Sequence, residues 1–177
     1  TNPSKIIGNV KKQKPKIEFW TKEEFEKVIS FIYKEDYYQH FLFISLLFLF
    51  MTGMRIGEAT AIQWDDINFD SGVLTINKTL YYKNQNDYRF VEPKTKASIR
   101  YIVLDQCTLD LLSEWKDVQQ NLIKTGFVMS YNGIPTQKHT IAHAIERYAK
   151  LAGVHRIKNH ALRHSHASLL ISMGKIH

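Results

Sequence analysis

Cysteine is almost absent from this sequence of 177 residues, in which Cys107 is the only one. A single thiol excludes a disulfide within the chain and a zinc site built from several cysteines. No stretch typical of a signal peptide opens the sequence. We therefore expect a protein of a reducing, cytoplasmic setting.

Long hydrophobic runs are also missing. The most apolar stretch, residues 41–51, is interrupted only by Ser45 and is far shorter than the roughly 18 residues that a membrane-spanning helix requires. It predicts a buried central helix and no membrane partner. With 44% hydrophobic residues, the chain has enough apolar side chains for the core of one ordinary domain.

Acidic residues are outnumbered by basic ones. The sequence has 24 Lys and Arg against 17 Asp and Glu, a formal net charge of +7. From residue 138 onward, seven of the eight histidines and seven Lys or Arg stand against a single acid, Glu146. This balance favours an anionic partner, but it does not separate DNA from RNA, an acidic protein or an anionic lipid.

Residues 1–16 contain five lysines, two prolines and no acid, and they show little apolar periodicity. We expect them to form a basic linker outside the core. The candidate DNA contacts in this linker are Lys11, Lys12 and Lys14. A solvated tail that contacts nothing is an equally good interpretation.

Helical periodicity predicts an α+β fold that is mainly helical. Helices are expected from a cap at Thr21 with Glu24 in a capping box, across 38–51, in a short stretch through Ile62, across 108–124 and 140–152, and from a cap at Asn159 to Gly174. Alternating segments predict strands at 64–69, 73–82, 88–92 and 99–104. We expect these to form a small antiparallel sheet of about three strands.

Two side chains suited to binding phosphate stand at the start of the last predicted helix. His160 and Arg163 are three residues apart, so they lie on one face of the helix, close to N–H groups and a dipole that favour an anion. The alternative is an amphipathic helix whose polar face is merely rich in histidine. A lone pair of this kind more often has that second explanation.

A second cationic motif lies upstream, where Arg55 follows Gly53 at the end of the apolar helix. Glu58, nearly one turn later, is placed to orient Arg55. Lys94 and Lys96 fall in the last connection of the predicted sheet, where a flexible tip could reach a phosphate. Lysines in such turns more often serve only solubility.

Arg55, the Lys94 of Pro-Lys-Thr, and the motif His160-x-x-Arg163 follow one another along the chain. In this order they resemble the catalytic domain of tyrosine recombinases of the phage-integrase type, over roughly residues 19 to 174. The resemblance implies that residues 17–177 form this domain. It also implies that the intact protein breaks and rejoins double-stranded DNA at attachment sites through a 3′-phosphotyrosyl intermediate, with other recombinase protomers and without a metal or cofactor.

Phosphodiester cleavage without a metal needs positive charge and many hydrogen-bond donors around the phosphate oxygens. Guanidinium groups present planar donors that stay charged, so Arg55 and Arg163 suit this need. His160 would add a donor and could transfer a proton. By resemblance, Lys94 would protonate the leaving 5′ oxygen.

Two further residues belong to the predicted site through their position. Lys96 lies two residues from Lys94, so it is the alternative general acid and otherwise a candidate DNA contact. His164, one residue after Arg163, is also a candidate DNA contact.

The second histidine and the nucleophilic tyrosine of the family are not found, because all nine tyrosines precede His160. The nearest, Tyr148, shares helical spacing with Ile141 and Ala144 and is therefore expected in the core. We expect that the chain lacks the C-terminal portion of the domain. By itself it should neither cleave nor join DNA.

Two other classes of protein fit some of these features. His160 with His164, and His139 with His143, have the i, i+4 spacing of metal ligands on a helix, as in a metal-dependent hydrolase. Neither pair has the glutamate of a zinc protease helix, and Arg163 would repel a cation. The other alternative is a DNA-binding module without catalysis, which the same basic surface would serve.

Overall fold

The computed structural model describes residues 18–93 and 95–174. The helices are α1 (Lys22–Ile29), α2 (Tyr37–Thr52), α3 (Ile56–Ala61), α4 (Gln106–Leu122), α5 (Lys138–Ala152) and α6 (Ala161–Ser172). The strands are β1 (Ile67–Asn68), β2 (Val73–Ile76), β3 (Thr79–Asn84), β4 (Asp87–Val91) and β5 (Arg100–Val103), with short 3-10 turns η2 (Trp64–Asp66) and η3 (Lys96–Ser98). The predicted α+β fold, mainly helical with antiparallel strands, is confirmed.

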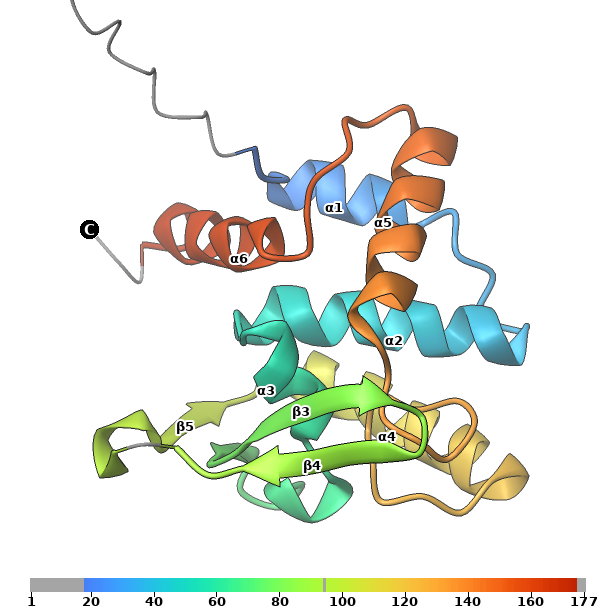
Figure 1. Ribbon diagram of the computed structural model, residues 1–177. Helices are drawn as coiled ribbons and strands as arrows, with labels where there is room; N and C mark the ends of the chain where they lie inside the picture. The colour runs from blue at the N-terminus through green and yellow to red at the C-terminus, as the bar shows by residue number, and fades with distance from the viewer. Residues whose placement is uncertain (1–17, 94, 175–177) are drawn as a thin grey trace, which may run out of the picture.

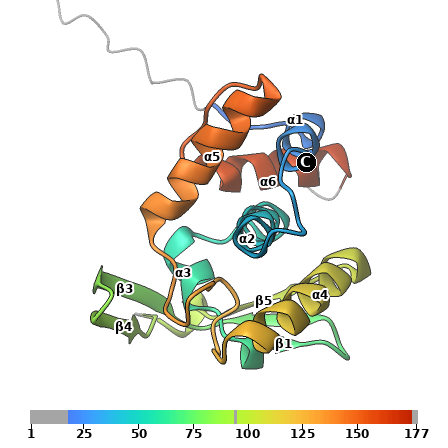
Figure 2. The same ribbon diagram turned by 90° about the vertical axis from the view of Figure 1, so that its right-hand side faces the viewer.

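Helix α2 runs through the centre of the molecule. Helices α1, α5 and α6 lie on one side of it, and α3, α4 and the strands lie on the other (Figures 1 and 2). The predicted central helix is thus correct, and most of its side chains are buried. Among the described residues, no helix is both long enough and apolar enough to cross a membrane.

Both ends of α2 are fixed by local chemistry. The Asp36 carboxylate accepts a hydrogen bond from the Gln39 N–H at 2.8 Å and so caps the first turn. Gly53 ends the helix in the left-handed region, at φ 66°, where a side chain would be strained. Helix α1 begins as predicted, with the capping box of Thr21 and Glu24, and Phe25 stacks on Phe50 of α2.

The strands form two small sheets: the predicted antiparallel sheet of three strands is present, and β3 and β4 form a second sheet that was not predicted. One has the order β1-β2-β5 and the other pairs β3 with β4, all antiparallel. The predicted strand 73–82 is broken at residues 77–78, because β2 pairs with β5 whereas β3 turns away to pair with β4. There the Lys78 ammonium donates to the Asp66 carboxylate at 2.6 Å, which holds the break against η2.

The start of the predicted strand 64–69 was also wrong, because residues 64–66 form η2. The Trp64 indole N–H donates to the Gln119 side chain on α4, and the Trp64 main-chain N–H donates to the Gly126 carbonyl. The Asp66 carboxylate accepts from the Gln63 N–H at 2.8 Å. These partners satisfy the polar groups of the segment without a neighbouring strand.

Tyr148 of α5 lies in the core, as its helical spacing predicted, with 1% of its surface exposed. Its hydroxyl donates to the Gln39 side chain of α2 at 3.1 Å. Burial raises the pKa of this phenol. Tyr148 is therefore a packing residue that ties α5 to α2.

His40 on α2 is a buried titratable group in the core. It is 3% exposed, its ring packs edge-on against Trp115, and its Nε2 has no hydrogen-bond partner. Burial lowers the pKa of His40 below its usual 6.5, although nearby Glu114 opposes the shift. The unfolded chain therefore binds this proton more readily than the folded one.

We predict that the free energy of unfolding falls as pH drops below 6.5, by at most about 1.4 kcal/mol per pH unit for this one proton. His40→Leu should remove this share of the pH dependence in chemical denaturation between pH 8 and pH 5. The same substitution at the exposed His143 should leave it in place. If the free energy of unfolding depended on pH in the same way for the His40→Leu variant and the wild type, His40 would not be the source of this pH dependence.

Candidate active site

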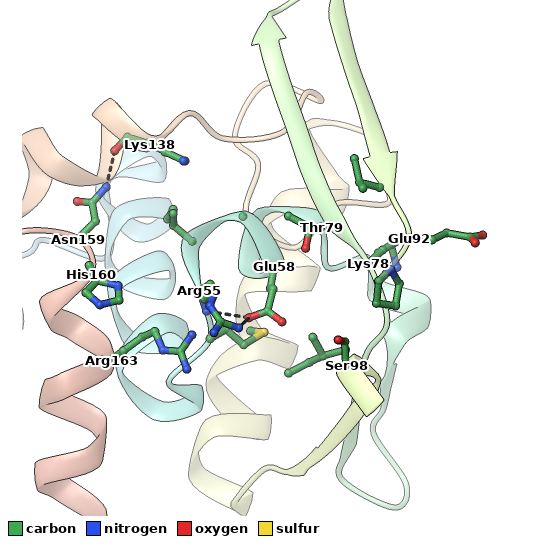
Figure 3. A pocket seen from close by; sticks show the side chains of 16 residues that line it. Arg55, Glu58, Lys78, Thr79, Glu92, Ser98, Lys138, Asn159, His160 and Arg163 are labelled. Atoms are coloured by element: carbon green, nitrogen blue, oxygen red, sulfur yellow. Dashed lines mark hydrogen bonds and ion pairs between the residues drawn. The ribbon is translucent and has the colours of Figure 1, made fainter. Parts of the chain in front are cut away.

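A cavity of about 710 Å³ opens where α3, α5 and α6 meet the strands (Figure 3). We call it the main cavity. Of the residues that the sequence singled out, Arg55, Glu58, His160 and Arg163 all line it, although they come from segments more than a hundred residues apart. Its other lining residues are Met54, Ile56, Gly57, Ile76, Lys78, Thr79, Val91, Glu92, Pro93, Ser98, Lys138 and Asn159.

Arg55 stands at the N-cap position of α3, two residues after the left-handed turn at Gly53. This turn reverses the chain so that the side chain after it faces α6. Gly53 is also packed closely: a Cβ atom there would lie 2.4 Å from Cδ2 of His166. A larger residue at position 53 would therefore displace the His166 side chain.

The Glu58 carboxylate has a different main partner from the one predicted. It receives two hydrogen bonds from the Arg100 guanidinium of β5, at 2.6 and 3.0 Å, whereas the Arg55 guanidinium lies 4.0 Å away. Glu58 does accept from the Arg55 main-chain N–H at 3.1 Å. It therefore fixes the Arg55 backbone more than the Arg55 side chain.

Burial alone would raise the pKa of Glu58. The hydrogen bonds from Arg100 and from the Arg55 N–H, and the positive charges of both arginines, outweigh burial and lower this pKa below its usual 4.5. Glu58 is thus an anion inside a cationic wall. Arg100 was missed by sequence reasoning, because it is distant in sequence from Glu58 and lies on a strand that offers no motif.

Helix α6 does not begin as predicted. Its N-cap position is His160, without a side-chain cap, and Asn159 does not cap the helix. The Asn159 amide instead donates to the Lys138 carbonyl at 2.9 Å and so joins the start of α6 to the start of α5. The side chain is diverted because the fold brings the Lys138 carbonyl of α5 next to it, which the sequence alone does not reveal.

Arg163 lies on α6 and points toward Arg55 (Figure 3). Its Nη1 is buried and has no hydrogen-bond partner. Burial lowers the pKa of Arg163, and the charges of Arg55 and Arg100 lower it further, while Glu58 opposes them. An arginine still keeps its charge, so the site holds an unmatched donor that an anion would satisfy.

The two histidines of the motif differ in position. His160 is exposed at the rim of the main cavity, and its ring stands edge-on to that of His164, at 5.1 Å between centroids. His164 is half-buried and does not line the cavity. It therefore supports His160 and is not itself part of the cavity wall.

His166 is a residue that sequence reasoning did not select. Its Nδ1 donates to the Phe50 carbonyl at 2.7 Å, next to the turn at Gly53. Burial lowers the pKa of His166, and the positive charge of Arg163 acts in the same direction. The contact joins the helix that carries Arg163 to the end of the helix that positions Arg55.

The predicted lysines are placed less completely. Lys94, Lys11, Lys12 and Lys14 lie outside the described residues. Lys96 is exposed in η3, between β4 and β5 as expected, and does not line the main cavity. Lys138, which does line it, was missed: nothing in the sequence indicates that the start of α5 shares a cavity with Arg163.

The described residues give no support to the metal-dependent hydrolase. They contain no group of three or more His, Cys, Asp or Glu side chains that could hold a metal ion. His139 and His143 face each other on α5 at 5.9 Å between ring centroids, without a third such ligand beside them. The charged lining of the main cavity instead consists of Arg55, Lys78, Lys138 and Arg163 with the two carboxylates Glu58 and Glu92.

Comparison with known proteins gives a consistent picture. Residues 18–175 match the model of the phage integrase family. The ICEBs1 integrase of Bacillus subtilis is 31% identical over 98% of this chain and 48% of its own, and a XerC-like tyrosine recombinase of Caldanaerobacter subterraneus is 28% identical over 89% and 44%. The chain thus spans about half the length of these curated relatives.

Solved structures agree in fold. The Tn1549 transposon integrase, in complex with transposon right end DNA, superposes with a TM-score of 0.76 at 20% identity, over 98% of this chain and 58% of that chain. XerH recombinase, bound to a palindromic difH substrate, superposes with a TM-score of 0.65 at 24% identity, over 89% and 43%.

We predict that Glu58→Gln lowers the free energy of unfolding by about 1–3 kcal/mol at pH 7, because the glutamine leaves Arg100 with an uncharged partner. The loss should shrink below pH 4.5: a lowered folded-state pKa contributes stability above that value and loses it as pH falls further. Chemical denaturation at pH 7 and pH 4 measures both effects.

The matched control is Glu26→Gln, which removes the exposed pair with Lys22 at 3.8 Å and should change stability by less than about 0.5 kcal/mol. Equal effects of the two substitutions would show that the Glu58 pair has no special structural role.

Proposed function

The chain belongs to the phage integrase family, and from this premise we propose that residues 17–177 are the catalytic domain of a site-specific DNA recombinase. The reaction would break and rejoin double-stranded DNA at attachment sites through a 3′-phosphotyrosyl intermediate. Residues 1–16, which lie outside the described residues, would be the basic linker that approaches the DNA. Such a protein would act in the cytoplasm.

One observation carries the proposal: Arg55, His160 and Arg163 surround the same cavity, and the buried Nη1 of Arg163 has no partner. A phosphodiester in the cavity would supply acceptor oxygens to these donors. Two guanidinium groups can bind a phosphate by paired hydrogen bonds and stabilise the additional negative charge of its transition state. Because the cavity already holds these charges in place, little reorganisation would accompany the reaction.

His160 and Lys94 would handle the protons. His160 stands at the exposed rim, where its ring could donate to a phosphate oxygen or transfer a proton. Lys94 keeps its role as the proposed general acid for the leaving 5′ oxygen, on the family pattern. Lys96 remains the alternative, from the same connection between β4 and β5.

The nucleophile would come from elsewhere: none of the described residues that line the main cavity is a tyrosine. Tyr148 is buried and hydrogen-bonded to Gln39, so it cannot reach a phosphate there. A tyrosine of another segment or of another protomer would serve. Several structural relatives are complexes with DNA, and one is a λ integrase dimer bound to a core site, which supports DNA and further protomers as partners.

We predict that the 177-residue chain binds duplex DNA weakly and mainly through the backbone. Contacts with several phosphates release counterions, so the affinity should fall about a thousandfold or more between about 50 and 200 mM salt. Fluorescence anisotropy with a labelled duplex of arbitrary sequence measures the dependence. Binding that does not change with salt, or no binding at low salt, would argue against DNA as the partner.

We further predict that the chain alone forms no covalent adduct with a nicked suicide duplex that carries its attachment site. A longer protein, in which a segment with the family tyrosine follows these residues, should form the adduct. Arg55→Ala or Arg163→Ala in that protein should reduce its rate by about a hundredfold or more, because each removes a transition-state donor. Denaturing gel electrophoresis detects the adduct.

Lys124→Ala, far from the main cavity on the segment after α4, is the control and should leave the rate unchanged. An adduct formed by the 177-residue chain itself would identify one of its own tyrosines as the nucleophile and overturn this assignment.

A further inference from the structure

A second hollow of about 690 Å³ lies beside the main cavity. Its walls come from α3, from β3 with the turn that follows it, and from the start of α5. Gly57 and Lys138 line both spaces. The remaining lining residues of the second hollow are Thr60, Leu80, Tyr81, Tyr82, Lys83, Asn84, Gln85, Thr136, Gln137 and His139.

The boundary between the two spaces is a close contact of α3 with β3. A Cβ atom on Gly57 would lie 2.9 Å from Cγ2 of Thr79, so a larger residue would displace the Thr79 side chain. Thr79 lines the main cavity, and the next residue, Leu80, lines the second hollow. The two spaces therefore follow each other along β3, and Lys138 lines both of them.

Lys138 is the cation that both spaces share without an ion-pair partner. Lys78 is paired with Asp66, and Arg100 with Glu58. No ion pair between described residues includes Lys138 or Arg163. The Lys138 backbone is held by the Asn159 amide, whereas its side chain is exposed and extends away from Asn159 (Figure 3).

The lining of the second hollow suits the backbone of a nucleic acid. It contains no aspartate or glutamate among the described residues, whereas Lys83, Lys138 and His139 supply basic groups, of which Lys83 also lies 3.9 Å from the Asp87 carboxylate. The amides of Asn84, Gln85 and Gln137 add neutral donors; the last already donates to the Tyr82 hydroxyl at 2.7 Å. Amides, hydroxyls and lysines are the usual partners of phosphate and sugar oxygens.

We propose that the second hollow is a subsite for the DNA strand next to the scissile phosphate, and that Lys138 binds the flanking phosphate. The proposal rests on the proposed function, which places the scissile phosphate between Arg55 and Arg163. Successive phosphates of one strand follow each other with a rise of about 3.4 Å along the duplex axis, so a strand with one phosphate in the main cavity would bring its neighbour near the rim. Lys138 stands at that rim on the side of the second hollow.

The salt dependence of DNA binding tests the role of Lys138. With a labelled duplex of arbitrary sequence as the probe, Lys138→Ala should lower the slope of log affinity against log salt by about 1, the value for one lost phosphate contact. Lys138→Arg should restore the slope, because it restores the charge. Lys124→Ala, which removes a lysine outside both spaces, should keep the wild-type slope.

A variant that combines Lys138→Ala with Arg163→Ala shows whether these residues bind two different phosphates or the same one. If Lys138 and Arg163 bind different phosphates, the losses of slope for Lys138→Ala and Arg163→Ala add in the combined variant. Losses that do not add would overturn the proposal, because both residues would then neutralise the same phosphate. A wild-type slope for Lys138→Ala, while Arg163→Ala lowers it, would also overturn the proposal and leave the proposed function intact.

The role of the second hollow is tested by two substitutions that each add one negative charge, one inside its lining and one outside. Asn84→Asp places a carboxylate on its lining, and Asn86→Asp places one in the same turn but outside the lining. The first should weaken DNA binding several-fold more than the second, although both change the net charge equally. Equal effects would overturn the subsite. Salt-independent binding by the wild type would instead contradict the proposed function on which the subsite rests.

Discussion

The pairing of Glu58 with Arg100 is the interaction on which the arrangement of the arginines at the main cavity depends. Arg55 and Arg163 line one cavity, Arg100 is bonded to the Glu58 carboxylate next to them, and charges of the same sign repel most strongly where burial lowers the effective dielectric. Glu58 is buried among them and remains an anion, because Arg100 and the Arg55 N–H donate to it. One negative charge thus offsets part of the repulsion without occupying the place of a phosphate.

Helix α2 provides the rigidity that this arrangement needs. It is buried on most sides and ends in the left-handed turn at Gly53, which delivers Arg55. The same end accepts the hydrogen bond from His166, so the helix that carries Arg163 is fixed to the same support. Two catalytic candidates from distant parts of the chain are therefore positioned by one element, and their separation does not depend on a flexible loop.

The cations in and next to the two spaces are of two kinds, those paired with a carboxylate and those without such a partner. Arg100 and Lys78 are matched by carboxylates and serve the fold, whereas Arg163 and Lys138 have no ion pair among the described residues. Unmatched charge next to a cavity lowers stability unless a ligand neutralises it. That pattern is expected of a surface that binds a polyanion.

The sequence by itself determined the mainly helical fold, the buried central helix, the first capping box and the core position of Tyr148. Each depends on periodicity or on neighbours within four residues, and both can be read from the amino-acid sequence alone. The motif around Arg163 and the order of the cationic residues also sufficed to place the chain in its family.

Only the tertiary structure decided which polar groups became partners. Asn159 bonds to the Lys138 carbonyl instead of capping α6, Glu58 binds Arg100 more closely than Arg55, and the predicted strand 73–82 divides between two sheets. In each case a group from a distant segment competes with the local partner. A hydrogen bond or strand pairing of this kind forms only if the packed core brings donor and acceptor atoms of distant segments within about 3 Å of each other. No local sequence pattern determines which distant segments come this close.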